Sequence, residues 1–192
     1  MALKSKEDSR LESEIERGRE ESDWKRVIDL AKQRRAKYSE RDVLASFLLG
    51  EGLLEMYLEE HAPVEENFVT AKLRLAEAKN LLQEASGEPG IALDAQLLLA
   101  KVHYAEGNYR EALGLYAQAG LENLSEKRLP LRSLRMIAEA YAIRALCTEA
   151  LPPGSTSKLQ NCLLYHISLI LKGITAYKYK NQISCAALLS EQ

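Results

Sequence analysis

Histidines and acidic residues are the first candidates for chemistry, because these side chains transfer protons and bind metals. The histidines His61, His103 and His166 are far apart in the sequence and lack the spacing of metal ligands. The acidic pairs 59–60 and 65–66 lie at predicted helix ends, where neighbouring carboxylates usually face solvent. The sequence therefore predicts neither catalytic residues nor a metal site, and we expect His103 to be a packed or partly exposed structural residue.

The three cysteines, Cys147, Cys162 and Cys185, are odd in number and widely spaced. They fit neither a disulfide framework nor a paired Cys-x-x-Cys zinc site, which favours a reducing compartment such as the cytosol. No glycine-rich phosphate loop, H-E-x-x-H motif or G-x-S-x-G motif occurs in the chain. We expect a non-enzymatic protein without a cofactor. An enzyme, or an enzyme regulator, with an unrecognised site is the alternative from another functional class.

The composition is that of an ordinary globular protein, with 46% hydrophobic and 28% charged residues in a chain of 192. A net charge of −2 implies neither a nucleic acid nor an acidic membrane as a direct partner. The N-terminal stretch MALKSKEDSRLESE lacks the apolar segment of a secretory signal. The longest apolar run, residues 162–171, is about half the roughly 20 residues that a membrane span needs. We therefore predict a cytoplasmic protein.

The densest basic patch is KQRRAK at residues 32–37. It allows two interpretations: a site for phosphoinositide head groups or nucleic acid, or an exposed helix end where cations suit the macrodipole. Acidic residues lie close by at Asp29, Glu40 and Asp42, and no aromatic residues interleave with the cations as in a nucleic-acid platform. The exposed helix end is the favoured interpretation.

Helical spacing of apolar residues recurs along the N-terminal half of the chain. Ser9 and Glu12 have the spacing of a capping box, which predicts a helix to about residue 21 with Leu11 and Ile15 buried. Ser22 or Asp23 can cap a second helix. The apolar residues of this second helix are Trp24, Val27, Ile28 and Ala31, and we expect the tryptophan to anchor two helices rather than to stack on a ligand.

The next two predicted helices carry small residues at defined positions. The helix over residues 42–60 contains Gly50 and Gly52, which we expect to mark the close passage of a neighbouring helix. The helix over residues 65–86 has a packing seam in which apolar residues are spaced three and four apart, followed by a turn at 87–90. The seam consists of Phe68, Ala71, Leu75, Ala78, Leu82 and Ala85.

Residues 97–120 read LLLAKVHYAEGNYREALGLYAQAG, which has the spacing of a tetratricopeptide repeat: two antiparallel helices joined at Gly107. Ala100 and Ala112 are small where the two backbones approach each other, and Tyr109 and Tyr116 fill the space beside them. The recognisable repeat spans about residues 93–124. It departs from the usual pattern at two positions, Gln96 in place of a tryptophan and Leu124 in place of a proline.

A single helical hairpin cannot bury its apolar face alone, so it needs stacked neighbours. Another helix is predicted from Pro130 to the stop at Pro152, and no segment favours a strand. The face of this helix is predicted to consist of Leu134, Ala138, Tyr141 and Ala145. The expected fold is all-α, with antiparallel helical hairpins stacked as a tetratricopeptide-like α-solenoid over residues 1–160.

Stacked hairpins of this kind bind peptides or neighbouring helices. The carboxylate clamp of chaperone-binding repeats would need Lys, Asn and Arg on the inner helices of three consecutive repeats. The recognisable repeat offers only Lys101. We therefore disfavour a receptor for chaperone tails, and the sequence identifies no partner-binding residues.

Four segments together resemble the N-terminal region of the tetratricopeptide repeat protein 7 family. They are SRLESEIERGREESDWKRVIDLAKQ from Ser9, LLGEGLLEMYLEEH from Leu48, AKVHYAEGNYREALGLYAQAGLENL from Ala100 and LRMIAEAYAIRALCTEALP from Leu134. The combination is specific, because a generic repeat would not also carry the amino-terminal E-I-E-R…W-x-R stretch. The resemblance covers about residues 9–160.

The resemblance implies a scaffold subunit of the plasma-membrane phosphatidylinositol 4-kinase type III alpha complex. The implied partners are the kinase, a hyccin-type subunit and a palmitoylated membrane anchor, so that the chain reaches the membrane only indirectly. A generic tetratricopeptide adaptor and a non-functional truncated product are the alternatives. Residues 161–192 look unlike the family, and we interpret them as a divergent tail of a truncated form, with one predicted helix near 159–171.

Overall fold

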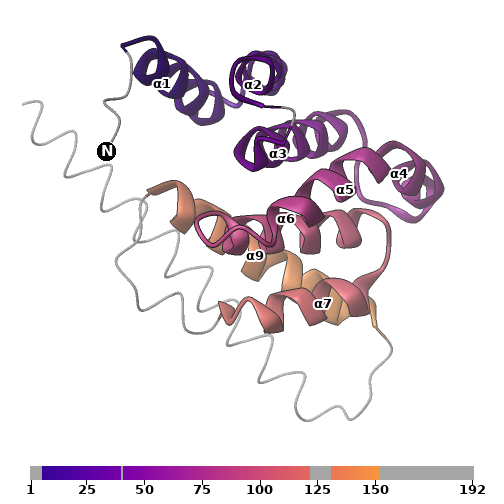
Figure 1. Cartoon of the computed structure of the whole chain (residues 1–192). Helices are drawn as coiled ribbons and strands as arrows, with labels where there is room; N and C mark the ends of the chain where they lie inside the picture. The colour runs from indigo at the N-terminus through magenta and orange to yellow at the C-terminus, as the bar shows by residue number, and fades with distance from the viewer. Residues whose placement is uncertain (1–5, 40, 122–130, 152–192) are drawn as a thin grey trace, which may run out of the picture. The chain divides into compact units, whose positions relative to one another are not determined.

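The computed structural model describes residues 6–39, 41–121 and 131–151, and every regular element in these ranges is a helix (Figure 1). The chain divides into two compact units, residues 1–108 and 109–192. The first unit contains α1 (Lys6–Glu20), α2 (Trp24–Tyr38), α3 (Val43–Glu60), the 3-10 helix η1 (Glu65–Asn67), α4 (Phe68–Arg74), α5 (Ala76–Ala85) and α6 (Ala92–Ala105). The second contains α7 (Tyr109–Gln118) and α9 (Leu131–Ala150). The all-α prediction is confirmed for the described residues.

Helices that follow one another pack as neighbours within each unit. In the first unit α1 packs on α2, α2 on α3 and α5 on α6, while α3 also contacts α5 and α6. In the second unit α7 packs on α9. Short connections between packed helices make the neighbours antiparallel, so the fold is the predicted tetratricopeptide-like stack of helical hairpins.

Helix α3 is the central element of the first unit, and its two glycines are points of close approach. A Cβ atom built on Gly50 would lie 2.8 Å from Leu82 Cγ in α5, and one built on Gly52 would lie 2.6 Å from Ile28 Cγ1 in α2. Residues two apart on a helix point about 200° apart. The two glycines therefore admit two different helices on opposite sides of α3, and the prediction of close approach is confirmed.

The predicted packing seam is confirmed, although the helix that carries it is not continuous. Its members from Ala71 to Ala85 are fully buried: Ala71, Leu75, Ala78, Leu82 and Ala85. The segment begins as η1, and Leu75 separates α4 from α5. The backbone of Leu75 stays in the right-handed helical region, and its N–H still donates a hydrogen bond to the Ala71 carbonyl at 2.8 Å.

Aspartates cap α2 and α3, whereas the predicted capping box of α1 is wrong. Asp23 accepts a hydrogen bond from the Arg26 N–H at 3.2 Å, and Asp42 accepts one from the Ala45 N–H at 3.1 Å. Helix α1 already begins at Lys6, so Ser9 lies inside it. The acidic Glu7 and Asp8 occupy its first turn, where negative charge is favourable.

The turn that closes the predicted repeat ends α6 in a Schellman motif. Gly107 has a φ of +76°, its N–H bonds the Tyr104 carbonyl at 3.0 Å, and the Asn108 N–H bonds the His103 carbonyl at 2.8 Å. The ring of Phe68 packs directly on this glycine, because a Cβ atom there would lie 2.5 Å from Phe68 Cδ2. The turn thus has the conformation that the sequence predicts.

In the second unit, Ala112 and Tyr116 of α7 are fully buried, as the repeat pattern predicts. The predicted face of α9 is only partly correct. Tyr141 is buried and donates a hydrogen bond to the Leu121 carbonyl at 2.7 Å, whereas Ala138 and Ala145 are half-buried. The buried residues of α9 are Ile137, Ala140, Tyr141, Ile143 and Cys147. The predictions for Leu124, Pro130, the Leu134 side chain, Pro152 and residues 161–192 lie outside the described residues.

Substituting either glycine of α3 by alanine should destabilise the chain, because the new methyl group would overlap a packed neighbour. We expect Gly50→Ala and Gly52→Ala each to lower the free energy of unfolding by about 1–3 kcal/mol in urea titrations followed by circular dichroism. Gly114→Ala in α7 is the matched control. No atom lies within 4 Å of its added Cβ, so it should gain about 0.5–1 kcal/mol. Equal effects at all three positions would contradict the close approach.

Candidate protein-interaction surface

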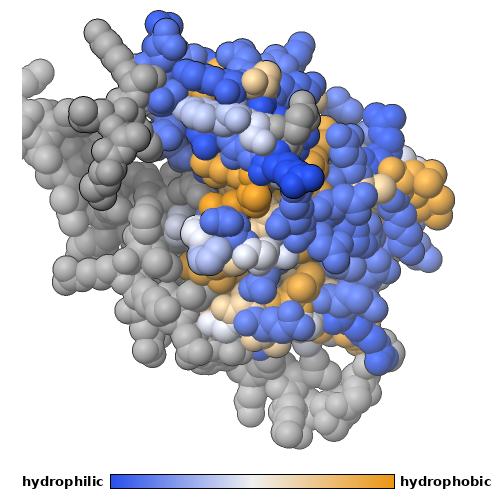
Figure 2. All heavy atoms as spheres, in the orientation of Figure 1, coloured by the Kyte–Doolittle hydropathy of each residue, from blue (hydrophilic) through white to orange (hydrophobic). Residues whose placement is uncertain are grey.

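The most exposed large hydrophobic side chains of the described residues lie side by side on α4. Val69 is 73% exposed and Leu73 is 76% exposed, whereas Tyr38, Val64 and Leu146 are only 45–47% exposed. Residues four apart on a helix are neighbours on its surface. Figure 2 shows hydrophobic atoms gathered at the surface over α4. We refer to Val69 and Leu73 as the apolar pair.

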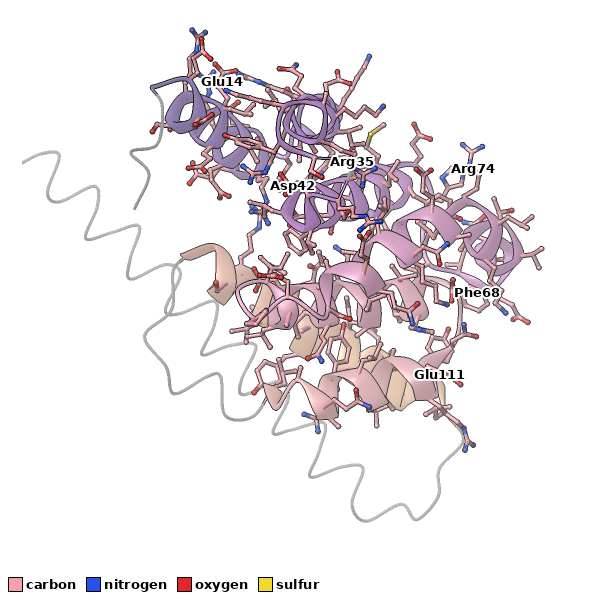
Figure 3. The ribbon with its side chains drawn as sticks, in the orientation of Figure 1. Glu14, Arg35, Asp42, Phe68, Arg74 and Glu111 are labelled. Atoms are coloured by element: carbon pink, nitrogen blue, oxygen red, sulfur yellow. The ribbon has the colours of Figure 1, made fainter. Side chains whose placement is uncertain are left out.

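The packing of α4 fixes the direction of the apolar pair. Ala71 is buried in the seam, and Phe68 is seated on Gly107. Val69 and Leu73 lie on the other side of the helix, roughly 150° from this buried face by helical geometry. The exposed cations Lys72 and Arg74 belong to the same helical turns as the apolar pair. The side chains of Phe68 and Arg74 leave α4 on different sides (Figure 3).

Sequence reasoning did not identify the apolar pair. A usable signal was present, because Val69 and Leu73 are apolar residues at helical spacing that do not belong to the seam. A short helix with apolar residues on two opposite sides buries one side in its own fold and leaves the other available to a partner.

Lys101 of α6, the one inner-helix residue that resembled a clamp, is not available to a peptide. It is only 6% exposed, and its Nζ atom lies 2.6 Å and 2.8 Å from the two carboxylate oxygens of Glu55 in α3. The ion pair joins two helices of the first unit. This geometry argues against a carboxylate clamp in the recognisable repeat.

A second buried ion pair joins α1 to α3. Arg19 and Glu51 are 5% and 4% exposed, with Nη2–Oε1 and Nε–Oε2 distances of 2.8 Å and 2.6 Å. The guanidinium also lies 5.4 Å from the centre of the Phe47 ring and binds Glu16 at 2.8 Å. Burial raises the pKa of Glu51 from 4.5 to about 7, although the positive charge of Arg19 opposes this shift.

The basic run at residues 32–37 connects helices and is not simply an exposed helix end. Arg34 binds Asp42 at 2.8 Å, and Arg35 donates a hydrogen bond to Ser46 Oγ at 2.9 Å. Both arginines are half-buried, while Lys32 and Lys37 are exposed. The expectation of a solvated face is therefore only partly correct, because the arginines stabilise the α2–α3 connection.

Oppositely charged residues also line the contact between α1 and α2. Lys37 lies 2.8 Å from Asp8 and 3.5 Å from Glu7, and Arg26 lies 3.5 Å from Glu14. The start of α1 thus meets the end of α2, as antiparallel packing requires. This arrangement gives the basic residues acidic partners inside the chain, and it weakens the alternative of a free site for phosphoinositides or nucleic acid.

The histidines and the cysteine that were considered for chemistry make contacts within the fold in the described residues. His61 stacks on the Tyr57 ring at 4.5 Å, and His103 Nδ1 lies 3.7 Å from Glu106 Oε2, which also accepts hydrogen bonds from Lys79 and Asn108. Burial raises the pKa of the Cys147 thiol to about 12, so this cysteine is a poor nucleophile. His166, Cys162 and Cys185 lie outside the described residues.

Within the described ranges, no group of three or more His, Cys, Asp or Glu residues is arranged to hold a metal ion. The same ranges contain no helix long and apolar enough to cross a membrane. The apolar pair is the candidate surface for an external contact that we consider in this part of the chain.

Comparison with known proteins agrees with the helical stack. The family model described as "Tetratricopeptide repeat protein 7 N-terminal" matches residues 1–163. The chain belongs to the tetratricopeptide repeat protein 7 family. The resemblance inferred from the four sequence segments is thereby confirmed.

Human tetratricopeptide repeat protein 7B is 40% identical over 191 residues, which cover 96% of this chain and 22% of the relative. The mouse protein 7B is 39% identical over 183 residues, and the human protein 7A is 32% identical over 177 residues. The chain spans about a fifth of the length of these relatives. With 96% of the chain covered, the alignment to the human protein 7B runs into residues 161–192.

Removing one partner of the buried Arg19–Glu51 pair should be far more costly than replacing both. At pH 8 we expect Arg19→Met to lower the free energy of unfolding by about 3–5 kcal/mol, because it leaves a buried carboxylate without its counterion. The double variant Arg19→Met/Glu51→Leu should recover most of this loss. Arg17→Met, which breaks an exposed pair with Glu21, should cost less than about 1 kcal/mol. If the destabilisation by the two substitutions simply added in the double variant, the coupling between Arg19 and Glu51 would be refuted.

The raised pKa of Glu51 predicts a pH dependence of stability. Between pH 4.5 and pH 7 the folded state retains a proton that the unfolded state releases, so raising the pH through this window should lower the free energy of unfolding. The decline should reach about 3 kcal/mol and should be much smaller in Glu51→Gln, where the raised pKa of Asp94 still contributes. Glu59→Gln, at an exposed position of the same helix, should retain the wild-type slope in urea titrations at each pH. An unchanged slope in Glu51→Gln would contradict the assignment.

Proposed function

We propose that this chain is a non-enzymatic scaffold that helps to assemble or localise a phosphatidylinositol 4-kinase complex at the plasma membrane. The observation that carries the proposal is the match of residues 1–163 to the N-terminal region of the tetratricopeptide repeat protein 7 family. The proposed partners are the kinase type III alpha, a hyccin-type subunit and a palmitoylated membrane anchor. The protein itself would be cytoplasmic and recruited peripherally through these partners.

The fold supports a role in holding proteins together. Stacked helical hairpins present extended, fairly rigid surfaces for peptides and helices. In the described residues the buried charged side chains are paired within the chain, as in Arg19–Glu51 and Lys101–Glu55. Their chemistry is that of helix-to-helix connections, which suits a scaffold better than an enzyme.

Co-purification from cells tests the scaffold role. We expect the tagged full chain to recover the kinase and the hyccin-type subunit, and tagged human tetratricopeptide repeat protein 7B is tested in a parallel sample. Gly50→Leu should lose both, because its side chain cannot fit against α5. Recovery by the human protein alone would contradict the proposal and would favour a generic adaptor or a non-functional product.

The purified chain should also show no turnover of phosphatidylinositol and ATP in the absence of the kinase subunit. Turnover by the chain alone would instead support the enzyme alternative.

A further inference from the structure

We propose that the apolar pair of α4, together with Lys72 and Arg74, is a docking surface for an acidic amphipathic helix of a protein partner. The inference deepens the proposed scaffold function and rests on it, because it assigns one protein contact to a defined surface. It requires no cofactor and no chemical step.

Both side chains of the apolar pair are mostly exposed. Val69 and Leu73 are 73% and 76% exposed, although the same helix buries Ala71 completely. Adjoining apolar side chains on a helix that is held by its opposite face form a surface that a second helix can cover with its own apolar stripe. The seating of Phe68 on Gly107 holds this surface in place.

The charges beside the apolar pair favour an acidic occupant. Lys72 and Arg74 are both exposed, and neither takes part in an ion pair with another described residue. Helix α4 itself contains no acidic residue. The acidic residues nearest to α4 in the sequence are Glu65 and Glu66 in η1 and Glu77 in α5. Positive charge is therefore concentrated on the helix that carries the pair, where carboxylates of a partner would be attracted.

The same charges disfavour two other occupants. If two copies of the chain met through α4, Lys72 and Arg74 of one copy would face those of the other, and such like-charge contacts are costly. An anionic lipid surface is typically bound by clusters of about four to eight basic residues, whereas α4 carries Lys72 and Arg74. A helix with an apolar stripe flanked by carboxylates satisfies both the apolar and the charged residues.

Two synthetic peptides test the proposal with the full chain. The first is a helical peptide with leucines at i, i+4 and i+7 flanked by glutamates, and the second is identical except that lysines replace these glutamates. We expect the wild-type chain to bind the acidic peptide at least tenfold more tightly than the basic one in fluorescence anisotropy. Lys72→Glu/Arg74→Glu should reverse this preference, and Val69→Ser/Leu73→Ser should weaken binding of the acidic peptide at least tenfold.

Leu146→Ser on α9, another partly exposed leucine, is the matched control and should bind like the wild type. Unchanged unfolding midpoints would show that the variants are folded. Equal binding of the two peptides by the wild type, or undiminished binding by Val69→Ser/Leu73→Ser, would overturn the proposal. A wild-type dimer that Val69→Ser/Leu73→Ser dissociates in sedimentation experiments would overturn it in favour of self-association. Peptide binding is measured without the kinase complex. Its outcome is therefore independent of the co-purification experiment that tests the proposed function.

Discussion

The structure of the first unit depends on how closely two helices can approach α3. Gly50 and Gly52 point to opposite sides of this helix, where α5 and α2 pack with no room for a methyl group. Glycine inside a helix weakens it by about 1 kcal/mol relative to alanine, so the packing of two neighbours has to offset this cost. The buried Ile28 of α2 and Leu82 of α5, which pack against these glycines, are part of that compensation. Helix α3 is thus stabilised more by the packing of α2 and α5 than by the helix propensity of its own residues.

Another side of α3 connects the helix to α1 and α6 through charge. Glu51 and Glu55 are four residues apart, so they share one side of the helix, and they bind Arg19 of α1 and Lys101 of α6. Such pairs add less net stability than apolar contacts of the same size, but each carboxylate requires its own counterion. The paired charges therefore restrict which helices can occupy these places, while the glycines set how near α2 and α5 can come.

The parts of this fold that sequence can predict are those governed by short-range spacing. The seam from Ala71 to Ala85, the turn at Gly107 and the role of Gly50 and Gly52 follow from residue types a few positions apart. The pairing of Arg19 with Glu51 joins residues 32 positions apart, and no local pattern specifies it. The capping box at Ser9 failed for a different, local reason, since α1 already begins at Lys6 and has Glu7 and Asp8 in its first turn.

The candidate surface was harder to predict than the fold, because exposure is decided by what the rest of the chain covers. Lys101 and the arginines of the basic run look like ligand-binding residues in the sequence, yet their charges meet partners within the first unit. Val69 and Leu73 look like additional core residues, yet the seam already fills the side of α4 that faces its neighbours. In a scaffold built from amphipathic helices, the residues that bind a partner are of the same chemical types as those that bind the next helix. Only the packing separates the two roles, and in the described part of this chain it leaves the apolar pair and its two cations on the outside.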